Sequence, residues 1–534
     1  MRSSIGVIVG ETSPFQFKFM MTKAVGRGAY VKAKCEGKEW MIAQIEEVKR
    51  TNTAYTLAQM ERPGSKPEVR EWVVAEARVL GVAANGRVRM PTTPSRPGEE
   101  VFLADERLIK ASLGLARGNM YIGILKGYDV PVELDANTLV QKHCSVLAKT
   151  GSGKSYTAAV ILEELLEKGV ALLVIDPHGE YASMKMANTE GDFGRFRIKP
   201  RGYDVAVYTP ATQVVNPKAD RPLRFNSMNL SAREIARMIP EEGSNGHLGL
   251  LYEAITALSA ETDVYDLEDV IRQVEKSTSK TKWNLIGQLE SLLELGIFSG
   301  QPTRTEELLA RGRASVIDMT GVSPEMQPMI VSRLLGEIFE ARKLGRVSPG
   351  MVVIEEAHNY IPERGTGKAA STPIIRTIAA EGRKFGLGLM IISQRPARVE
   401  KNVISQCNTQ IIMRVTNPND LKALSKGLEG MTGELEEEIK RLPAGTAMLV
   451  SNEIERPVVV NIRPRKSKHG GISTPIVARE ISDGAAGGPA AAGQGGAGQG
   501  QERRARPGNG RPGKDAPPKS PAGLLKKMFG PRQA

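Results

Sequence analysis

Residues Ala148–Ser155 read AKTGSGKS, directly after an apolar run at Ser145–Ala148 and directly before an amphipathic helix predicted over Tyr156–Lys168. A glycine-rich turn between a strand and a helix presents backbone N–H groups to an anion, and the helix N-terminus adds favourable potential. The stretch therefore predicts a phosphate-binding loop. Its backbone donors are predicted at Thr150, Gly151, Ser152, Gly153 and Lys154.

Each side chain of this loop has a predicted role toward a nucleoside triphosphate. Lys154 can reach the β and γ oxygens, and the Ser155 hydroxyl can take a coordination position on Mg²⁺. The predicted nucleotide-binding set also includes Tyr156, the next residue. We expect ATP and Mg²⁺ as ligands, and GTP stays open.

The size and composition of the chain are those of a globular protein with several domains. It has 534 residues, 40% of them hydrophobic and 25% charged, which predicts two to four domains. We expect no membrane-spanning segment and no leader, and hence a cytoplasmic protein. Cys35, Cys144 and Cys407 are too widely spaced for a zinc cluster and indicate buried thiols in a reducing compartment.

The net charge of +13 is concentrated at the C-terminal end. Residues 501–534 hold nine Lys or Arg residues against Glu502 and Asp515. A basic tail suits a polyanionic partner, and a solvated charged surface explains it equally well. Both interpretations stay open at this point.

The pattern along the chain predicts an α/β protein with additions. Short alternating segments predict a small β-barrel or sandwich over residues 1–95. Strand–helix alternation predicts a core in two parts, 96–229 and 301–466, with an inserted helical bundle at 230–300. Residues 467–534 are predicted to be an extension and a disordered basic tail. The buried strands of the core are predicted at Cys144–Ala148, Ala171–Ile175, Val205–Tyr208, Ser315–Ile317, Met351–Ile354, Leu387–Ile392, Gln410–Val415 and Thr446–Val450.

Acidic residues follow two of these strands. Glu355 and Glu356 end the apolar strand Met351–Ile354, at the sheet edge where ligands of such sheets bind. Glu355 is predicted to hold Mg²⁺ through water, and Glu356 to polarise the attacking water. Asp176 is predicted to bond Glu356 or a metal-bound water. The alternatives are solubilising acids at Glu355 and Glu356, and a simple turn at Asp176.

Two further polar residues complete the predicted site. Gln394 ends the strand Leu387–Ile392 and can sense the γ-phosphate or its water. Arg383 precedes the same strand, so it should lie at the bottom or side of the sheet, away from its own site. That place suits insertion into the site of a neighbouring subunit, and an ordinary surface arginine is the alternative.

These motifs together resemble the HerA branch of the HerA/FtsK family of ring ATPases. The matching pieces, in the family's order over residues 1–466, are Ser4–Pro14, Lys142–Ser155, Asp176–Tyr181, Ile354–Tyr360, Glu381–Gly386 and Ser393–Pro396. The resemblance implies a RecA-like core and a homo-hexameric ring that translocates on double-stranded DNA. It also implies work with a NurA-type nuclease, often beside Mre11–Rad50, in DNA end resection.

The resemblance implies roles for the residues already chosen. Glu356 is the catalytic carboxylate, Gln394 the sensor and Arg383 the finger that reaches the adjacent subunit. Two positions depart from the family's pattern. The metal-coordinating acid is usually Asp, and Glu355 is one methylene longer. Lys142 stands where an arginine would have a forked guanidinium, so a finger role there is doubtful.

Basic loops are the predicted DNA contacts. Arg364 and Lys368 lie in the loop after the acid pair, and Lys185 and Arg195 lie in a second basic block. Ordinary exposed loops are the alternative for both. Two other functions stay open for the whole chain: a ring motor for a polymer other than DNA, and a nucleotide-gated scaffold that docks and activates a nuclease.

Overall fold

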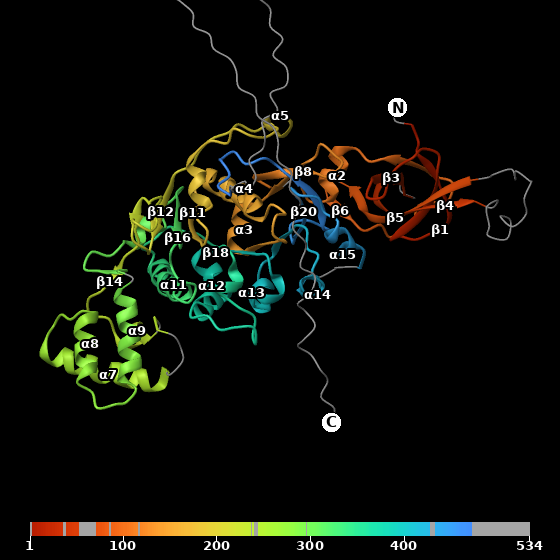
Figure 1. The fold of residues 1–534 in the computed structure, drawn as a ribbon. Coiled ribbons are helices and arrows are strands. Elements are labelled where there is room, and N and C mark those ends of the chain that lie inside the picture. Colours follow the sequence, from red (N-terminus) through yellow and green to blue (C-terminus); the bar gives the residue numbers. More distant parts are fainter. Residues whose placement is uncertain are drawn as a thin grey trace, which may run out of the picture. The chain divides into compact units, whose positions relative to one another are not determined.

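The computed structural model describes residues 3–471 except 36–38, 53–70, 85–86, 116–117, 237, 240–243, 295 and 428–432. Of the predicted extension and tail, residues 472–534, with the basic charges of 501–534, lie outside the described residues. Among those described, no helix is long and apolar enough to cross a membrane. Figure 1 shows the elements in the order of the chain.

The N-terminal strands close into a six-stranded antiparallel barrel, in the order β2-β1-β7-β3-β4-β5 with β5 pairing back to β2. Alternation along these strands buries one side chain in two, as at Phe17 and Phe19. The barrel continues past residue 95, because β7 pairs with both β1 and β3. The strands are β1 (Gly6–Thr12), β2 (Gln16–Met21), β3 (Tyr30–Lys34), β4 (Trp40–Asn52), β5 (Glu71–Ala84), β6 (Arg87–Arg89) and β7 (Glu100–Leu103).

The core is a twelve-stranded sheet in the order β13-β12-β16-β11-β17-β18-β10-β19-β20-β21-β8-β9. The stretch from β12 to β19 is parallel, and the strands from β20 to β9 are antiparallel. The strands are β8 (Met120–Leu125), β9 (Pro131–Leu134), β10 (Cys144–Leu147), β11 (Ala171–Asp176), β12 (Val205–Thr209), β13 (Arg221–Pro222), β16 (Ala314–Asp318), β17 (Gly350–Ile354), β18 (Leu387–Ser393), β19 (Thr409–Ile412), β20 (Thr446–Ser451) and β21 (Val458–Ile462).

All eight predicted core strands are present, and the α/β fold class is confirmed. The strands are apolar on both faces because helices cover both. Val146 packs in a core that includes α4 (Lys154–Glu167) and α3 (Ala136–Gln141). Its neighbour Leu147 packs in a second core. That core includes α11 (Gln327–Lys343), α12 (Thr372–Phe385), α13 (Lys401–Ile404), α14 (Pro418–Gly427) and α15 (Gly433–Lys440).

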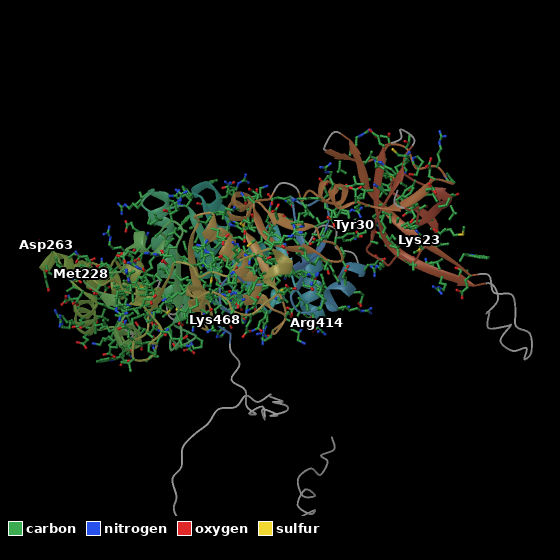
Figure 2. The ribbon with its side chains drawn as sticks, turned by 90° about the horizontal axis from the view of Figure 1, so that it is seen from above. Lys23, Tyr30, Met228, Asp263, Arg414 and Lys468 are labelled. Atoms are coloured by element: carbon green, nitrogen blue, oxygen red, sulfur yellow. The ribbon has the colours of Figure 1, made fainter. Side chains whose placement is uncertain are left out.

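A helical block with its own core is inserted between β14 (Phe225–Asn226) and β15 (Phe298–Ser299), which pair with each other. It consists of α6 (Ala232–Ala236), α7 (Ser244–Glu261), α8 (Leu267–Glu275) and α9 (Lys282–Glu294). Met228 lies before α6, and Asp263 lies between α7 and α8 (Figure 2). The short helices elsewhere are α2 (Glu106–Ser112), α5 (Phe193–Phe196), α10 (Thr305–Leu308), η1 (Tyr181–Lys185), η2 (Ala357–Asn359) and η3 (Pro396–Arg398).

Candidate nucleotide-binding site

The predicted phosphate-binding loop connects β10 to α4. Gly151 (φ 77°) and Gly153 (φ 98°) adopt the left-handed backbone conformation, which glycine accepts without steric cost. Gly153 is the N-cap of α4, so the loop leads directly into the helix N-terminus. The backbone thus takes the strand–turn–helix form that anion binding requires.

Lys154 is buried between the two acids predicted to work with it. Its Nζ lies 2.7 Å from Glu355 Oε1 and 2.5 Å from Glu356 Oε1. Burial alone would lower the pKa of Lys154, but the charges of Glu355 and Glu356 outweigh burial and raise it. A buried cation held by two carboxylates can transfer part of that pairing to phosphate oxygens.

The predicted metal-binding pair is also brought together. The Ser155 hydroxyl lies 3.2 Å from Glu355 Oε1, and the Tyr181 hydroxyl donates to Glu355 Oε2 at 2.6 Å. Two oxygen ligands, one of them a carboxylate, suit Mg²⁺, which keeps several of its waters. Ser155 and Glu355 therefore fit the ion, and the longer Glu355 side chain still reaches the serine.

Glu356 has the features of a general base. It is a non-glycine residue at φ 49°, a strained conformation that is concentrated at active sites. Its Oε2 is buried and has no hydrogen-bond partner among the described residues, although His358 Nδ1 lies 3.3 Å away. A buried carboxylate oxygen without a donor can accept a proton from water.

His358 contacts residues at the ends of two neighbouring strands, β17 and β18. Its Nδ1 lies 3.2 Å from Ser393 Oγ at the end of β18. Burial lowers the pKa of His358, the charge of Glu356 opposes this, and the charges of Arg395, Lys154 and Arg398 lower it further. The imidazole is therefore neutral near pH 7. The residue lies in the stretch Ile354–Tyr360 that resembles the family, but a contact between two strand ends has no local sequence signal.

Gln394 lies where it was predicted. β18 pairs with β10 on one side and with β17 on the other, which places Gln394 between the phosphate loop and the acid pair. Its side chain contacts the Thr150 hydroxyl. A change at the phosphate loop therefore reaches Gln394 directly.

Asp176 is buried at the end of β11 but does not contact Glu356. Its carboxylate accepts from the backbone N–H groups of His178, Gly179 and Tyr181 at 3.1, 2.9 and 2.9 Å. Burial, with the charges of Asp318 and Glu355, raises the pKa of Asp176 to about 7. These hydrogen bonds are those of the simple turn that was the alternative for Asp176. Asp176 is linked to Glu355 only through Tyr181, whose backbone N–H donates to Asp176 and whose hydroxyl donates to Glu355. Asp318, buried at the end of β16, was missed because a lone acid after a strand is common.

Arg383 and the DNA-contact candidates lie on the surface, at different places. Arg383 is exposed in the last turn of α12, ahead of β18 and so at the opposite edge from the phosphate loop. Arg364, Lys368 and Arg195 are exposed. Lys185 pairs with Asp220 at 2.6 Å, so its charge is already neutralised.

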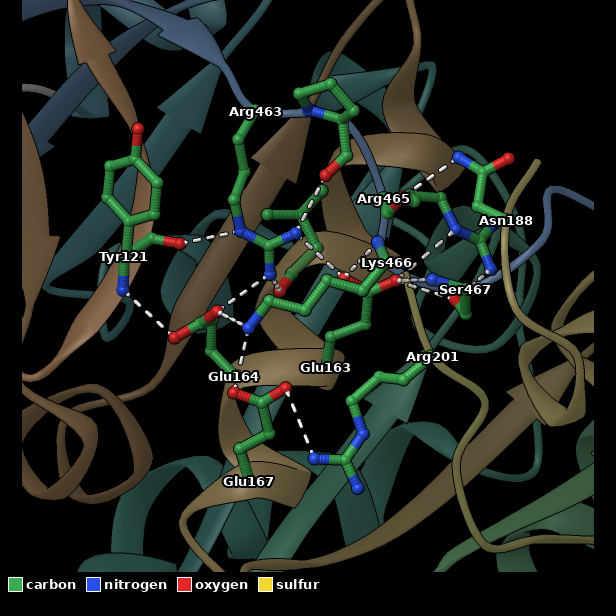
Figure 3. Close-up of polar contacts among 12 residues, drawn as sticks. Tyr121, Glu163, Glu164, Glu167, Asn188, Arg201, Arg463, Arg465, Lys466 and Ser467 are labelled. Carbon is green, nitrogen blue, oxygen red and sulfur yellow. Dashed lines mark hydrogen bonds and ion pairs between the residues drawn. The ribbon is translucent and has the colours of Figure 1, made fainter. Parts of the chain in front are cut away.

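Residues 463–471, here called the C-terminal strap, bind the helix that follows the phosphate loop (Figure 3). Order was expected to fade after about residue 466, but the strap is described to Gly471. Arg463 is fully buried and pairs with Glu163 at 2.9 Å and Glu164 at 2.8 Å, both on α4. These contacts join residues about 300 positions apart, which no local pattern reveals.

Tyr156 also belongs to this network. Its hydroxyl accepts from the backbone N–H of Arg465 at 2.8 Å, and its ring packs edge-on against His469. The predicted nucleotide contact of Tyr156 is thus limited to its backbone, because the strap engages its side chain.

Comparisons with known proteins agree with this architecture. The family description "HAS barrel domain" matches residues 5–85 and "Helicase HerA, central domain" matches residues 120–338. A DNA double-strand break repair helicase HerA of Pyrococcus furiosus is 26% identical, covering 89% of this chain and 94% of the relative. A probable helicase of Methanocaldococcus jannaschii is also 26% identical, covering 88% and 92%.

Among solved structures, VirB4 of Thermoanaerobacter pseudethanolicus covers 65% of this chain and 96% of its own, with 14% identity and a TM-score of 0.46. The bacterial conjugative coupling protein TrwB covers 69% and 94%, with 14% identity and a TM-score of 0.46. The sequence matches extend over barrel and core alike. The chain is therefore similar to the archaeal HerA helicases over most of its length, in its barrel and in its core.

Proposed function

We propose that this chain is an ATP-driven translocase or helicase for double-stranded DNA that works as a homo-hexameric ring. The observation that carries the proposal is the pairing of Lys154 with Glu355 and Glu356 beside the phosphate loop. DNA is proposed as the polymer because the relatives are named as DNA double-strand break repair helicases. ATP is the energy source in this proposal.

The chain's own residues divide the chemistry among them. The loop backbone and Lys154 bind the phosphates, while Ser155 and Glu355 would hold Mg²⁺, which neutralises phosphate charge when bound. Glu356 takes a proton from the attacking water through Oε2, which accepts no hydrogen bond within the described part of the chain. Gln394 senses the change through its contact with Thr150.

The ring would complete the site. Arg383, exposed at the far edge of the sheet, suits a contact with the phosphates of a neighbouring subunit, where an arginine finger is worth roughly 10³–10⁵ in kcat. Arg364 and Lys368 would contact the DNA backbone without reading bases. A NurA-type nuclease, and Mre11–Rad50 beside it, are the proposed partners in end resection.

The test is the steady-state ATPase rate with and without duplex DNA, beside Glu356→Gln. We expect strong stimulation by DNA in the native chain and a loss of about 10²–10⁴ in kcat in the variant. An ATPase that Glu356→Gln abolishes but that duplex DNA leaves unstimulated would favour a motor for another polymer.

A scaffold role is the second candidate, because the barrel exposes large apolar side chains. Phe15 is 65% exposed and Met20 is 44% exposed, and such residues mark docking surfaces when they cluster. Phe15→Asp with Met20→Asp would test this role without disturbing the barrel interior. Lost nuclease stimulation with DNA-stimulated ATPase retained would support a docking function for the barrel.

A further inference from the structure

A pocket of about 830 Å³ opens beside the phosphate loop. Three segments form it: the start of the loop, the turn after β18 and the segment after β19, with Thr366 as a further wall residue. Lys154, Ser155, Glu355 and Glu356 do not line it. The pocket thus adjoins the nucleotide site and shares Thr150 and Gln394 with it.

The walls carry unneutralised positive charge. Lys149, Arg395 and Arg398 line the pocket and are exposed, and none has an ion-pair partner in the described part of the chain. The one acid in the lining, Asp420, is nearly buried and accepts from the backbone N–H of Ala397 at 3.0 Å. Arg376, outside the pocket, is by contrast paired with Glu400. The pocket therefore attracts an anion.

The remaining lining residues suit a ligand with hydrogen-bonding oxygen atoms better than a nucleobase. Asn417 lines the pocket, and its Oδ1 already accepts from the backbone N–H of Asn419, which leaves its amide nitrogen to donate. The lining holds no aromatic side chain, so a base has nothing to stack on. Thr366 lies two residues after Arg364, which is exposed and extends the basic surface outward. Cations and amide donors without stacking suit a phosphodiester.

The pocket is connected to the catalytic carboxylate through one turn. Gln394 lines the pocket and contacts Thr150 of the phosphate loop. The backbone N–H of Arg395 donates to Ser393 Oγ at 3.0 Å, and the same oxygen lies 3.2 Å from His358 Nδ1, beside Glu356. A ligand held by Arg395 would therefore act on the turn that carries both the sensor and the contact to the base.

We propose that this pocket binds a backbone phosphate of duplex DNA through Arg395 and Arg398, and so couples DNA binding to Gln394. The inference rests on the proposed function, since it names where the DNA acts on the ATPase site. Each neutralised phosphate contributes about 0.9 to the slope of log affinity against log salt. A single phosphate contact therefore has a measurable signature.

The experiment compares the full chain with Arg395→Gln/Arg398→Gln, using a labelled duplex oligonucleotide and a non-hydrolysable ATP analogue. Binding is measured over a range of salt concentrations. We expect the double variant to bind DNA more weakly and to lower the salt slope by roughly 1. Arg346→Gln is the matched control, because Arg346 is exposed and lies ahead of β17, at the opposite edge of the sheet.

Two outcomes would overturn the inference, and a third concerns the proposed function. An unchanged slope and affinity would remove the DNA contact. An unchanged slope with weaker binding of the ATP analogue would assign the pocket to the nucleotide. If the native chain itself neither binds duplex DNA nor is stimulated by it, the proposed translocase fails first.

Discussion

Glu163→Gln tests whether the C-terminal strap is held by a buried charge. Glu163 is fully buried on α4 and accepts four hydrogen bonds. They come from Arg463 Nη1 at 2.9 Å, Lys466 N at 3.0 Å, Ser467 N at 2.8 Å and Ser467 Oγ at 2.6 Å. Glutamine keeps the shape of the side chain, removes its charge and replaces one acceptor oxygen by a donor.

The size of the effect follows from what remains. Removing one partner of a buried ion pair costs about 3–5 kcal/mol, because the other charge is left unpaired. Arg463 retains its ion pair with Glu164 at 2.8 Å. We therefore expect a loss of stability at the lower end of this range, about 3 kcal/mol. Since about 1.4 kcal/mol is a factor of ten, the strap should open roughly a hundredfold more often.

Amide hydrogen exchange measures this opening locally. Exchange of the strap amides should accelerate roughly a hundredfold in Glu163→Gln. The matched control is Glu167→Gln, one turn further along α4. Glu167 also contacts Lys466, at 2.8 Å, but its side chain is 24% exposed, so its loss should cost about 0–1 kcal/mol. Equal exchange in the two variants would refute the reasoning, and so would acceleration spread evenly over the whole chain.

Three further predictions concern the nucleotide site. The pKa of Asp176 is about 7 in the folded state, whereas the ordinary pKa of an aspartate side chain is 3.8. The folded state therefore binds more protons between these values, and stability should fall as pH rises through them; Asp176→Asn should flatten this slope in thermal melts taken across that range. His358→Ala removes the neighbour of Glu356, so kcat should fall about tenfold with little change in KM for ATP, and an unchanged kcat would count against the link. Tyr181→Phe removes the donor to Glu355, so more Mg²⁺ should be needed for half-maximal ATPase, as a magnesium titration of both proteins would show.

Local patterns were sufficient for the core strands and the phosphate loop. An apolar run of strand length followed by a polar turn marks the end of a buried strand, and the carboxyl ends of parallel strands meet at one edge. Lys154, Glu356 and Gln394 could therefore be assigned to one site from their places along the chain. The glycines of the loop and the helix after it reinforced that assignment.

Pairings between distant residues left no such signal. β8 and β21 are neighbours in the sheet although they lie far apart in the chain, and neither was predicted. The ion pair between Lys185 and Asp220 likewise decides whether Lys185 is available to DNA. Asp220 is 35 positions away in the chain, so the sequence around Lys185 shows its charge but not its ion-pair partner.

The strap has a consequence for biosynthesis. Glu163 leaves the ribosome about 300 residues before Ser467, its partner. Until then the Glu163 carboxylate is solvated, and α4 lacks its contacts with Arg463 and Ser467. A nascent or prematurely terminated chain would thus carry a complete phosphate loop on an unfinished helix, with an acidic face exposed to chaperones and proteases. Synthesis of β21 and the strap completes the cover of that helix, so only a chain that extends to about Ser467 acquires the fully packed helix beside the phosphate loop.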